Sequence, residues 1–315
     1  MLIPILLLIV GFVALILGAN WLVDGATSVG IRAKLSPLII GLTIVAFGTS
    51  LPELIINVFS CIKGSSGLAI GNIVGSNIMN ILFILGVASI IYPIDVSRIS
   101  IRRDIPAGFV ATGALFVFAN YTWGSLSINW IEGVLLLVMA AFYLFLTMKK
   151  NESPSNEVEA VQIPLPWWKT ILFLVLGIIG LYLGGELVSN NAQKIAKAWG
   201  MSEAMIGLTV VAMATSLPEL ITSIVAATKK NSGIAIGNVL GSNILNIFVV
   251  LGISGLITPL QFDNQLNSTL LFLFGANALM TLFVFTGKGT KLSRFEGVLM
   301  LCAFIGFMTY TVISK

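Results

Sequence analysis

The stretch GTSLPEL at residues 48–54 recurs as ATSLPEL at residues 214–220, and GNIVGSNIMNI at 71–81 recurs as GNVLGSNILNI at 237–247. A shift of 166 residues aligns Ser36–Ile81 with Ser202–Ile247 without a gap, and 27 of these 46 positions are identical. Chance does not produce such agreement, so the chain contains two copies of one structural unit.

The composition indicates that a lipid bilayer surrounds most of this chain. Of its 315 residues, 57% are hydrophobic and 10% are charged, and the mean hydropathy is +1.03, whereas a soluble domain carries about 25% charged residues. The chain has no histidine, which removes the commonest general base and transition-metal ligand. Its 17 Lys and Arg residues form no basic stripe, so nucleic-acid binding is not expected.

Ten segments are apolar enough to cross a bilayer, which takes about 20 residues. They are 2–23, 37–62, 68–91, 105–120, 129–148, 168–188, 203–228, 233–257, 267–286 and 295–313. Five fall in a first repeat at 1–148 and five in a second at 167–315, and a polar linker at 149–166 joins the repeats. We therefore predict an all-α integral membrane protein with ten transmembrane helices in two five-helix repeats.

The two repeats are expected to be inverted relative to one another. Because five is an odd number, the second repeat enters the membrane from the side opposite to the first. Lys and Arg accumulate on the cytoplasmic side, and 13 of the 17 fall in alternate loops that share one face, against four on the other. We expect both termini outside and the linker in the cytoplasm, and the size of the chain suggests the plasma membrane of a prokaryote.

Glu53 and Glu219 lie inside apolar segments, at matching positions of the two repeats. An ionised carboxylate near the bilayer centre costs roughly 2.5–3.5 kcal/mol on insertion scales, and such residues usually face a cavity, pair with another group or bind ions. No Lys, Arg or His lies in the middle of any expected span. The structural alternative is a protonated glutamic acid that is hydrogen-bonded within the bundle, but the duplication favours a bound cation.

Small residues and further oxygen donors accompany each glutamate. Helical spacing gathers one set per repeat on or beside the glutamate's face: Ala46, Thr49 and Ser50, then Ala212, Thr215 and Ser216. Pro52 and Pro218 break the helical hydrogen-bond pattern there and free backbone carbonyls. The next span carries a polar stripe every four residues: Asn72, Ser76 and Asn80, then Asn238, Ser242 and Asn246. For Asn77 and Asn243, beside these stripes, we expect helix capping or interhelical hydrogen bonds rather than ligation.

These groups are hard oxygen donors, which bind Ca²⁺, Na⁺, K⁺ or Mg²⁺ in preference to transition metals. Ca²⁺ and Na⁺ suit an irregular oxygen cage better than Mg²⁺, which demands octahedral geometry. The two glutamates would neutralise one Ca²⁺.

The paired motifs GTSLPEL with GNIVGSNIMNI, and ATSLPEL with GNVLGSNILNI, resemble the repeats of the cation/calcium exchanger superfamily, especially prokaryotic sodium/calcium exchangers. The resemblance implies that Glu53 and Glu219 bind Ca²⁺ with help from backbone oxygens of Thr49 and Thr215. It also implies that Na⁺ competes there and at neighbouring sites, at the positions of Ala46, Ser50, Ser76, Ala212, Ser216 and Ser242.

One central position departs from the prokaryotic pattern, which has Asn in the first repeat and Asp in the second. This chain has Asn80 and Asn246. Potassium-dependent members carry Asp at both positions, so the resemblance implies that this chain does not depend on K⁺. It leaves Ca²⁺ binding to the glutamates in place and the number of Na⁺ ions open.

The hypothesis that follows is secondary antiport, in which Ca²⁺ and Na⁺ compete for one central site whose access alternates between the two faces. Ca²⁺/H⁺ exchange with the same glutamates is the alternative, and a passive cation channel is a rival from a different class. No enzyme activity, cofactor or obligatory protein partner is expected. A serine nucleophile inside the membrane, such as Ser50 or Ser216, would have no His or Lys nearby to act as its base. Asp24 and Glu186, near the ends of their spans, are expected to be solvated, with an ion entry path as the alternative.

Overall fold

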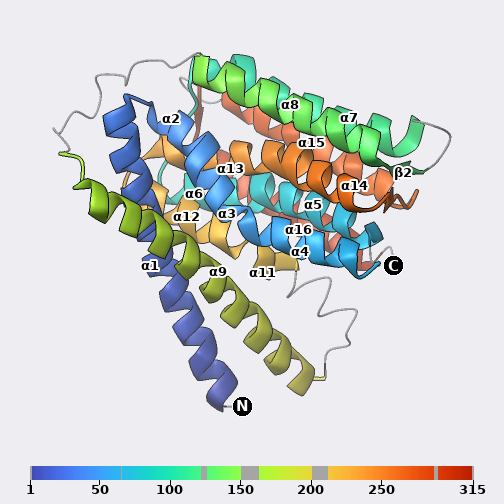
Figure 1. The fold of residues 1–315 in the computed structure, drawn as a ribbon, viewed down its shortest axis with the longest axis horizontal. Helices are drawn as coiled ribbons and strands as arrows, with labels where there is room; N and C mark the ends of the chain where they lie inside the picture. Colours follow the sequence, from blue (N-terminus) through green and yellow to red (C-terminus); the bar gives the residue numbers. More distant parts are fainter. Residues whose placement is uncertain are drawn as a thin grey trace.

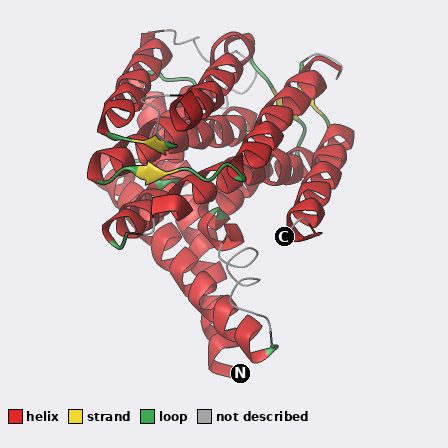
Figure 2. Ribbon diagram, turned by 90° about the vertical axis from the view of Figure 1, so that its right-hand side faces the viewer, coloured by secondary structure: helices red, strands yellow, loops and turns green. Residues whose placement is uncertain are grey.

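A computed structural model describes residues 2–64, 66–121, 126–149, 163–200, 212–286 and 290–313, and almost all of them are helical (Figures 1 and 2). The first half contains α1 (Leu2–Ala33), α2 (Pro37–Ile40), α3 (Ala46–Thr49), α4 (Leu51–Ile62), α5 (Ser66–Met79), α6 (Leu85–Ile91), α7 (Ile105–Tyr121) and α8 (Trp130–Lys149). The second half contains α9 (Trp167–Ala198), α11 (Ala212–Thr215), α12 (Leu217–Thr228), α13 (Ser232–Leu245), α14 (Gly252–Ile257), α15 (Leu266–Thr286) and α16 (Arg294–Ile313). Among the described residues, π-helical turns interrupt the α-helices at η1 (Gly41–Val45), η2 (Asn80–Ile84), η3 (Ser100–Asp104) and η6 (Asn246–Leu251).

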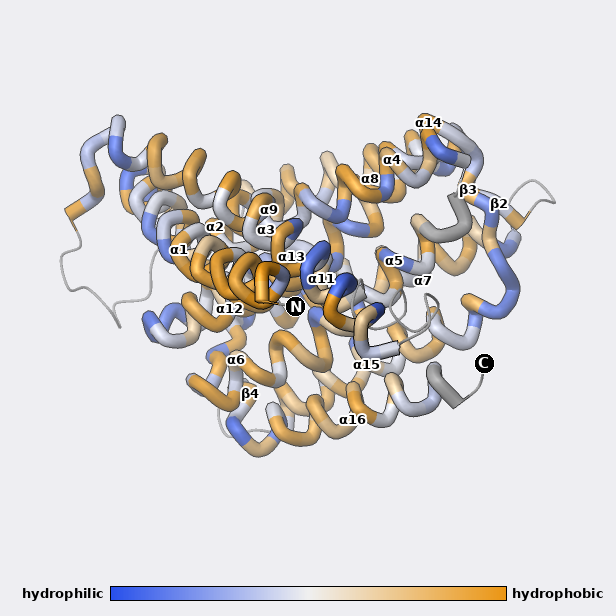
Figure 3. Tube along the Cα trace, turned by 90° about the horizontal axis from the view of Figure 1, so that it is seen from below, coloured by the Kyte–Doolittle hydropathy of each residue, from blue (hydrophilic) through white to orange (hydrophobic). Residues whose placement is uncertain are grey.

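The protein is a membrane protein by the length and composition of its helices. Within the described ranges, six helices are long and apolar enough to cross a bilayer, and a seventh span is the pair Pro37–Thr49 and Leu51–Ile62, which bends by 42° at Ser50. Figure 3 shows the hydrophobic colouring along most helices, including α1 and α9. The sequence predicts a break of the helix beside Pro52, and the bend at Ser50 confirms this prediction.

The two polar-striped helices form the centre of the bundle. In the most apolar 18-residue part of Ala69–Ile91 and of Ser232–Ile257, 78% of the residues are buried, whereas the corresponding shares in α1 and α9 are 22% and 28%. Buried helices that carry amides and hydroxyls must satisfy those groups inside the protein. The polar stripes are therefore internal, as a binding site requires, and the long apolar helices surround them.

α1 and α9 cross in close contact and extend beyond the rest of the bundle (Figures 1 and 2). A Cβ atom on Gly18 would lie 2.8 Å from the backbone nitrogen of Leu181, and one on Gly177 would lie 2.7 Å from that of Leu22. Only glycine permits such backbone approach, as in the small-residue interfaces of membrane helices. Each helix has 32 residues and contains one of the predicted spans 2–23 and 168–188. The helices continue past these spans through their more polar ends.

The repeat is visible in the element boundaries. The 166-residue shift carries α4 onto α12 and α5 onto α13, and it carries the strand β1 (Ile94–Asp95) onto β3 (Leu260–Gln261). β1 pairs with β4 (Lys291–Leu292), and β3 pairs with β2 (Ser127–Ile128), both antiparallel. Each of the two sheets thus contains one strand from the first half and one strand from the second half. The all-α expectation missed these four strands, because two-residue strands leave no periodic signal.

The described end of the predicted linker packs on α1. Arg32 donates a hydrogen bond to the Leu165 carbonyl, and its guanidinium lies 4.7 Å from the centre of the Trp167 ring. Ser28 and Thr170 hydrogen-bond at 2.8 Å. Residues 150–162 of the linker lie outside the described part of the chain.

Candidate cation site

Glu53 and Glu219 occupy equivalent places after two helix breaks. The backbone turns with φ −85° and ψ 4° at Ser50, and with φ −90° and ψ 7° at Ser216. α4 and α12 begin at the next residue, so proline is second and glutamate third in each helix. Proline is tolerated there because the first turn has no internal acceptors for its N–H groups. Each carboxylate therefore lies at the positive end of a helix, inside the bundle.

Both glutamate side chains are completely buried, at 0% exposure. Among the described residues, neither carboxylate oxygen of Glu53 has a hydrogen-bond partner, and Oε2 of Glu219 has none. The Ser50 hydroxyl donates to Oε1 of Glu219 at 3.0 Å. Ser50 lies one helical turn before Glu53. The hydrogen bond therefore places the Glu219 carboxylate, from the second half, next to the turn that carries Glu53 in the first half.

Further buried oxygens that have no hydrogen-bond partner among the described residues lie around these two helices. α4 packs against α5 and η6, and α12 packs against η2. The oxygens are Oγ of Ser76 on α5, Oδ1 of Asn80 on η2, Oδ1 of Asn246 on η6 and Oγ of Ser216 just before α12, and their side chains are at most 3% exposed. A buried acceptor without a donor costs free energy. A concentration of such acceptors is what a hard cation with several oxygen ligands would satisfy.

Thr49 links the first half to the polar stripe of the second. Its hydroxyl lies 3.0 Å from Oδ1 of Asn238 and 3.4 Å from the hydroxyl of Ser242, and all three side chains are buried. The amide nitrogen of Asn238 also donates to the carbonyl of Glu219 at 3.2 Å and to the Ser223 hydroxyl at 3.0 Å. Asn238 therefore fixes α12 and α3 relative to one another.

Asn77 and Asn243 make the interhelical hydrogen bonds that the sequence predicts. The side-chain nitrogen of Asn77 donates to the Asn243 carbonyl at 3.0 Å, and that of Asn243 donates to the Asn77 carbonyl at 3.1 Å. The 166-residue shift relates Asn77 to Asn243, so the two hydrogen bonds are equivalent in the two halves. α5 and α13 thus meet around a local two-fold axis.

The remaining predicted site residues are placed as follows. Ala46 is buried, and its carbonyl accepts from the Ser50 N–H at 3.0 Å and from the Thr49 hydroxyl at 3.2 Å. Thr215 is 6% exposed and closes α11 just before the second break. Ala212 begins α11, and its side chain lies outside the described part. Asn72 donates to Oδ1 of Asn57 at 3.1 Å, one turn after Glu53 on α4.

The carboxylates near the span ends have different surroundings. Asp24 pairs with Lys229 at 2.6 Å, which joins α1 to the end of α12, and Glu186 is exposed. Both are accessible, with Asp24 46% exposed, which fits the solvated reading of these residues.

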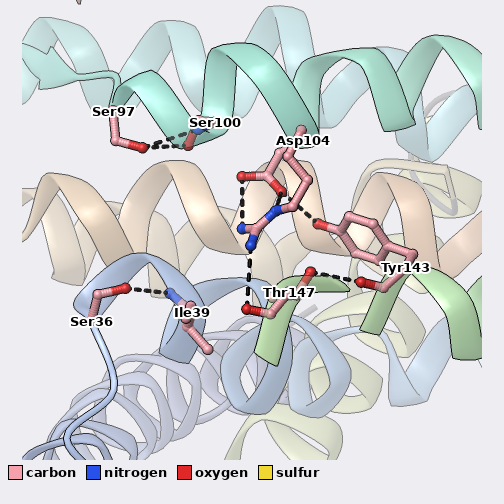
Figure 4. Close-up of polar contacts among 8 residues, drawn as sticks. Ser36, Ile39, Ser97, Ser100, Asp104, Tyr143 and Thr147 are labelled. Carbon is pink, nitrogen blue, oxygen red and sulfur yellow. Dashed lines mark hydrogen bonds and ion pairs between the residues drawn. The ribbon is translucent and has the colours of Figure 1, made fainter. Parts of the chain in front are cut away.

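Sequence reasoning missed a second buried polar cluster, between η3 and α8 (Figure 4). Asp104 is 0% exposed, pairs with Arg103 at 2.6 Å and accepts from the Tyr143 hydroxyl at 3.2 Å. Arg103 also donates to the Thr147 carbonyl at 3.2 Å. The only sequence signal for this cluster is an Arg-Asp pair at the start of an apolar segment, and charged residues at such a position are usually solvated at the end of a span. The charged groups of this cluster are paired with one another, unlike the carboxylate of Glu53.

A multi-span helical membrane protein with an oxygen-rich site at two broken helices is the class that this fold and site define. The family model described as "Sodium/calcium exchanger protein" matches residues 3–149 and again residues 169–313, once in each half. The chain is 36% identical over 320 residues to the putative antiporter CaxA of Alkalimonas amylolytica, with 98% of both chains covered. It is 30% identical over 341 residues to the sodium/calcium exchanger MaX1 of Methanosarcina acetivorans, covering 96% of this chain and 97% of that protein.

A solved structure gives the same result. The sodium-calcium exchanger NCX_Mj, soaked with 10 mM Na⁺ and no Ca²⁺, superposes with a TM-score of 0.83 at 32% identity over 96% of this chain and 97% of that one. The chain belongs to the sodium/calcium exchanger family, and its prokaryotic type is the one that the repeated motifs predict.

Proposed function

We propose that this protein is a secondary antiporter that exchanges Ca²⁺ for Na⁺ at a central site between Glu53 and Glu219. The observation that carries the proposal is a pair of fully buried carboxylates, at matching positions of the two halves, with three of their four oxygens lacking a hydrogen-bond partner among the described residues. Two carboxylates balance the charge of one Ca²⁺. Na⁺, which is similar in size, competes for the same oxygens, and competition for one site is what couples the two fluxes.

The arrangement of the halves supports alternating access in ten spans. In the expected topology, β1 and β4 lie in loops on one face of the membrane, and β2 and β3 lie in loops on the other. The observed pairings join loops of the same face in both cases. Two halves with opposite orientations can exchange conformations, which opens one central site to each side in turn. We place both termini outside and the protein in the plasma membrane, acting as a transporter and not as an enzyme.

Ca²⁺/H⁺ exchange would use the same glutamates, with protons in place of Na⁺. The hydroxyls of Ser76 and Ser216, which have no partner in the ranges that the structure describes, favour Na⁺, because a proton on a carboxylate needs no additional oxygen ligands. A passive channel is disfavoured because an internal repeat suits a rocking mechanism, whereas channels commonly build their selectivity rings from assembled subunits.

The test is ⁴⁵Ca²⁺ uptake into proteoliposomes that contain the purified protein. An outward Na⁺ gradient is expected to drive uptake, and an outward H⁺ gradient at equal Na⁺ is not. Uptake driven by the H⁺ gradient alone would replace Na⁺ with H⁺ as the coupling ion. Uptake that needs neither gradient would indicate a channel.

A further inference from the structure

Four asparagines form a closed hydrogen-bond cluster at the contact of α5 with α13. In addition to the two bonds to backbone carbonyls, the amide nitrogen of Asn80 donates to Oδ1 of Asn243 at 3.0 Å, and that of Asn246 donates to Oδ1 of Asn77 at 3.2 Å. All four side chains are at most 5% exposed. The 166-residue shift converts each bond into another bond of the same cluster.

Two backbone carbonyls determine the orientation of all four amides. A carbonyl can only accept, so the side-chain nitrogens of Asn77 and Asn243 must be the atoms that face the carbonyls. Their Oδ1 atoms then point to the neighbouring amides, which must present nitrogen in turn. Consequently the Oδ1 atoms of Asn80 and Asn246 face away from the cluster, and within the described part of the chain these buried oxygens have no hydrogen-bond partner.

The cluster also restricts which residues fit at positions 80 and 246. An aspartate at position 246 would place a carboxylate oxygen where a nitrogen now donates to Oδ1 of Asn77, so two acceptors would face each other. Asn77 cannot turn its amide round without losing its own bond to the Asn243 carbonyl. The same holds for position 80 and Asn243. The pattern therefore favours neutral amides beside the glutamates.

We propose that Asn77 and Asn243 are positioning residues, which hold the amide oxygens of Asn246 and Asn80 toward the cation and keep the charge of the site at that of the two glutamates alone. This inference rests on the proposed function. Each positioning residue acts across the interface, on the amide of the other half. Neither contacts the amide three residues away on its own helix, according to the bonds found among the described residues.

The test is a set of double-mutant cycles read out as the KM and maximal rate of ⁴⁵Ca²⁺ transport in proteoliposomes. Asn77→Ala is expected to raise the KM for Ca²⁺ by about 2- to 10-fold, the equivalent of one net hydrogen bond, with the maximal rate near that of the wild type. Asn246→Asp should raise the KM by at least about tenfold, which corresponds to an unpaired buried acceptor. In the Asn77→Ala background, the increase in KM caused by Asn246→Asp should be severalfold smaller, because the space vacated by Asn77 admits a water molecule that can donate to the new carboxylate at position 246.

The cross-interface pairs 77 with 246 and 243 with 80 are therefore expected to couple. The matched controls are the same-helix pairs 77 with 80 and 243 with 246, which belong to the same cluster but share no direct hydrogen bond among those found, so their coupling should be weaker. Equal coupling in all four pairs, or an Asn246→Asp variant with wild-type KM, would overturn the positioning role. A wild-type protein that shows no Ca²⁺ transport would instead overturn the proposed function, so the two failures are distinguishable.

Discussion

Ser50 and Ser216 are equivalent residues of the two halves with different surroundings. The Ser50 hydroxyl donates to the Glu219 carboxylate at 3.0 Å, whereas the Ser216 hydroxyl is buried and has no partner in the described part of the structure. One glutamate is therefore partly satisfied by a protein donor, and the other is not. Sequence cannot reveal this difference, because both motifs read TSLPEL.

Replacing each serine with alanine tests this asymmetry. In cation-free buffer, Ser50→Ala is expected to lower the free energy of unfolding by about 1–3 kcal/mol, because Oε1 of the buried Glu219 carboxylate loses its donor. Ser216→Ala removes a hydroxyl without a partner, so its effect should stay within about 0.5 kcal/mol. The midpoint of thermal unfolding in detergent measures both. Equal losses of stability in the two variants would contradict the assigned hydrogen bond.

At the same scale, the sequence predicts the composition of the site but not its connections. Glu53 and Glu219 are evident because charged residues in apolar segments are costly. The bonds of Thr49 to Asn238 and Ser242 depend on how α3 meets α13, which no spacing within one helix can indicate. The sequence treats Asn238 as part of a ligand stripe, whereas its amide is occupied by Thr49, Ser223 and the backbone of Glu219.

At the scale of elements, the contact of α1 with α9 depends on glycine. A Cβ on Gly18 would also lie 2.9 Å from the Gly177 carbonyl, and backbone atoms cannot rotate away as a flexible side chain can. Gly18→Ala is therefore expected to destabilise the protein by about 1–3 kcal/mol through overpacking. The control is Gly275→Ala on α15, whose new methyl group would meet nothing within 4 Å.

The control variant should keep or slightly raise the midpoint of thermal unfolding, because alanine is the better helix former. If Gly18→Ala leaves the midpoint unchanged as well, the two helices do not pack as closely as described. The sequence predicts both helices but not their contact, since glycines are frequent throughout the chain and only the structure shows which of them touch. The sequence also does not show how far α1 and α9 continue beyond their spans, because residues 24–33 and 189–198 mix polar and apolar types without a clear boundary.

For the whole molecule, the inverted arrangement is tested by a matched pair of surface positions. Asp95 and Gln261 are related by the 166-residue shift, both are exposed, and each lies in a two-residue strand. Asp95 is expected in the cytoplasm and Gln261 outside. In a background that lacks Cys61 and Cys302, a membrane-impermeant thiol reagent applied to intact cells should label Gln261→Cys and not Asp95→Cys.

Inverted membrane vesicles should give the opposite labelling pattern. Labelling of both positions from one side would show that the halves are parallel, and the topology would have to be revised. The sequence supports the inversion through the number of spans and the distribution of Lys and Arg. It does not indicate that the strands of the two halves pair with one another, because those pairings join residues 132 or more positions apart.

The central claim is that one cation site lies between Glu53 and Glu219 and that Na⁺ and Ca²⁺ compete for it. The most direct measurement is equilibrium ⁴⁵Ca²⁺ binding to the purified protein, with and without Na⁺, for the wild type, Glu53→Gln, Glu219→Gln and the control Glu132→Gln. Glu132 is also buried, at 1% exposure, and its Oε1 likewise has no partner among the described residues, but its Oε2 accepts from the Asn129 N–H at the start of α8. We predict that the wild type and Glu132→Gln bind Ca²⁺ and release it to Na⁺, while the other two variants bind at least about 100-fold more weakly, as expected when a charged ligand is lost from a buried site. Wild-type Ca²⁺ affinity in either Glu53→Gln or Glu219→Gln would contradict the account.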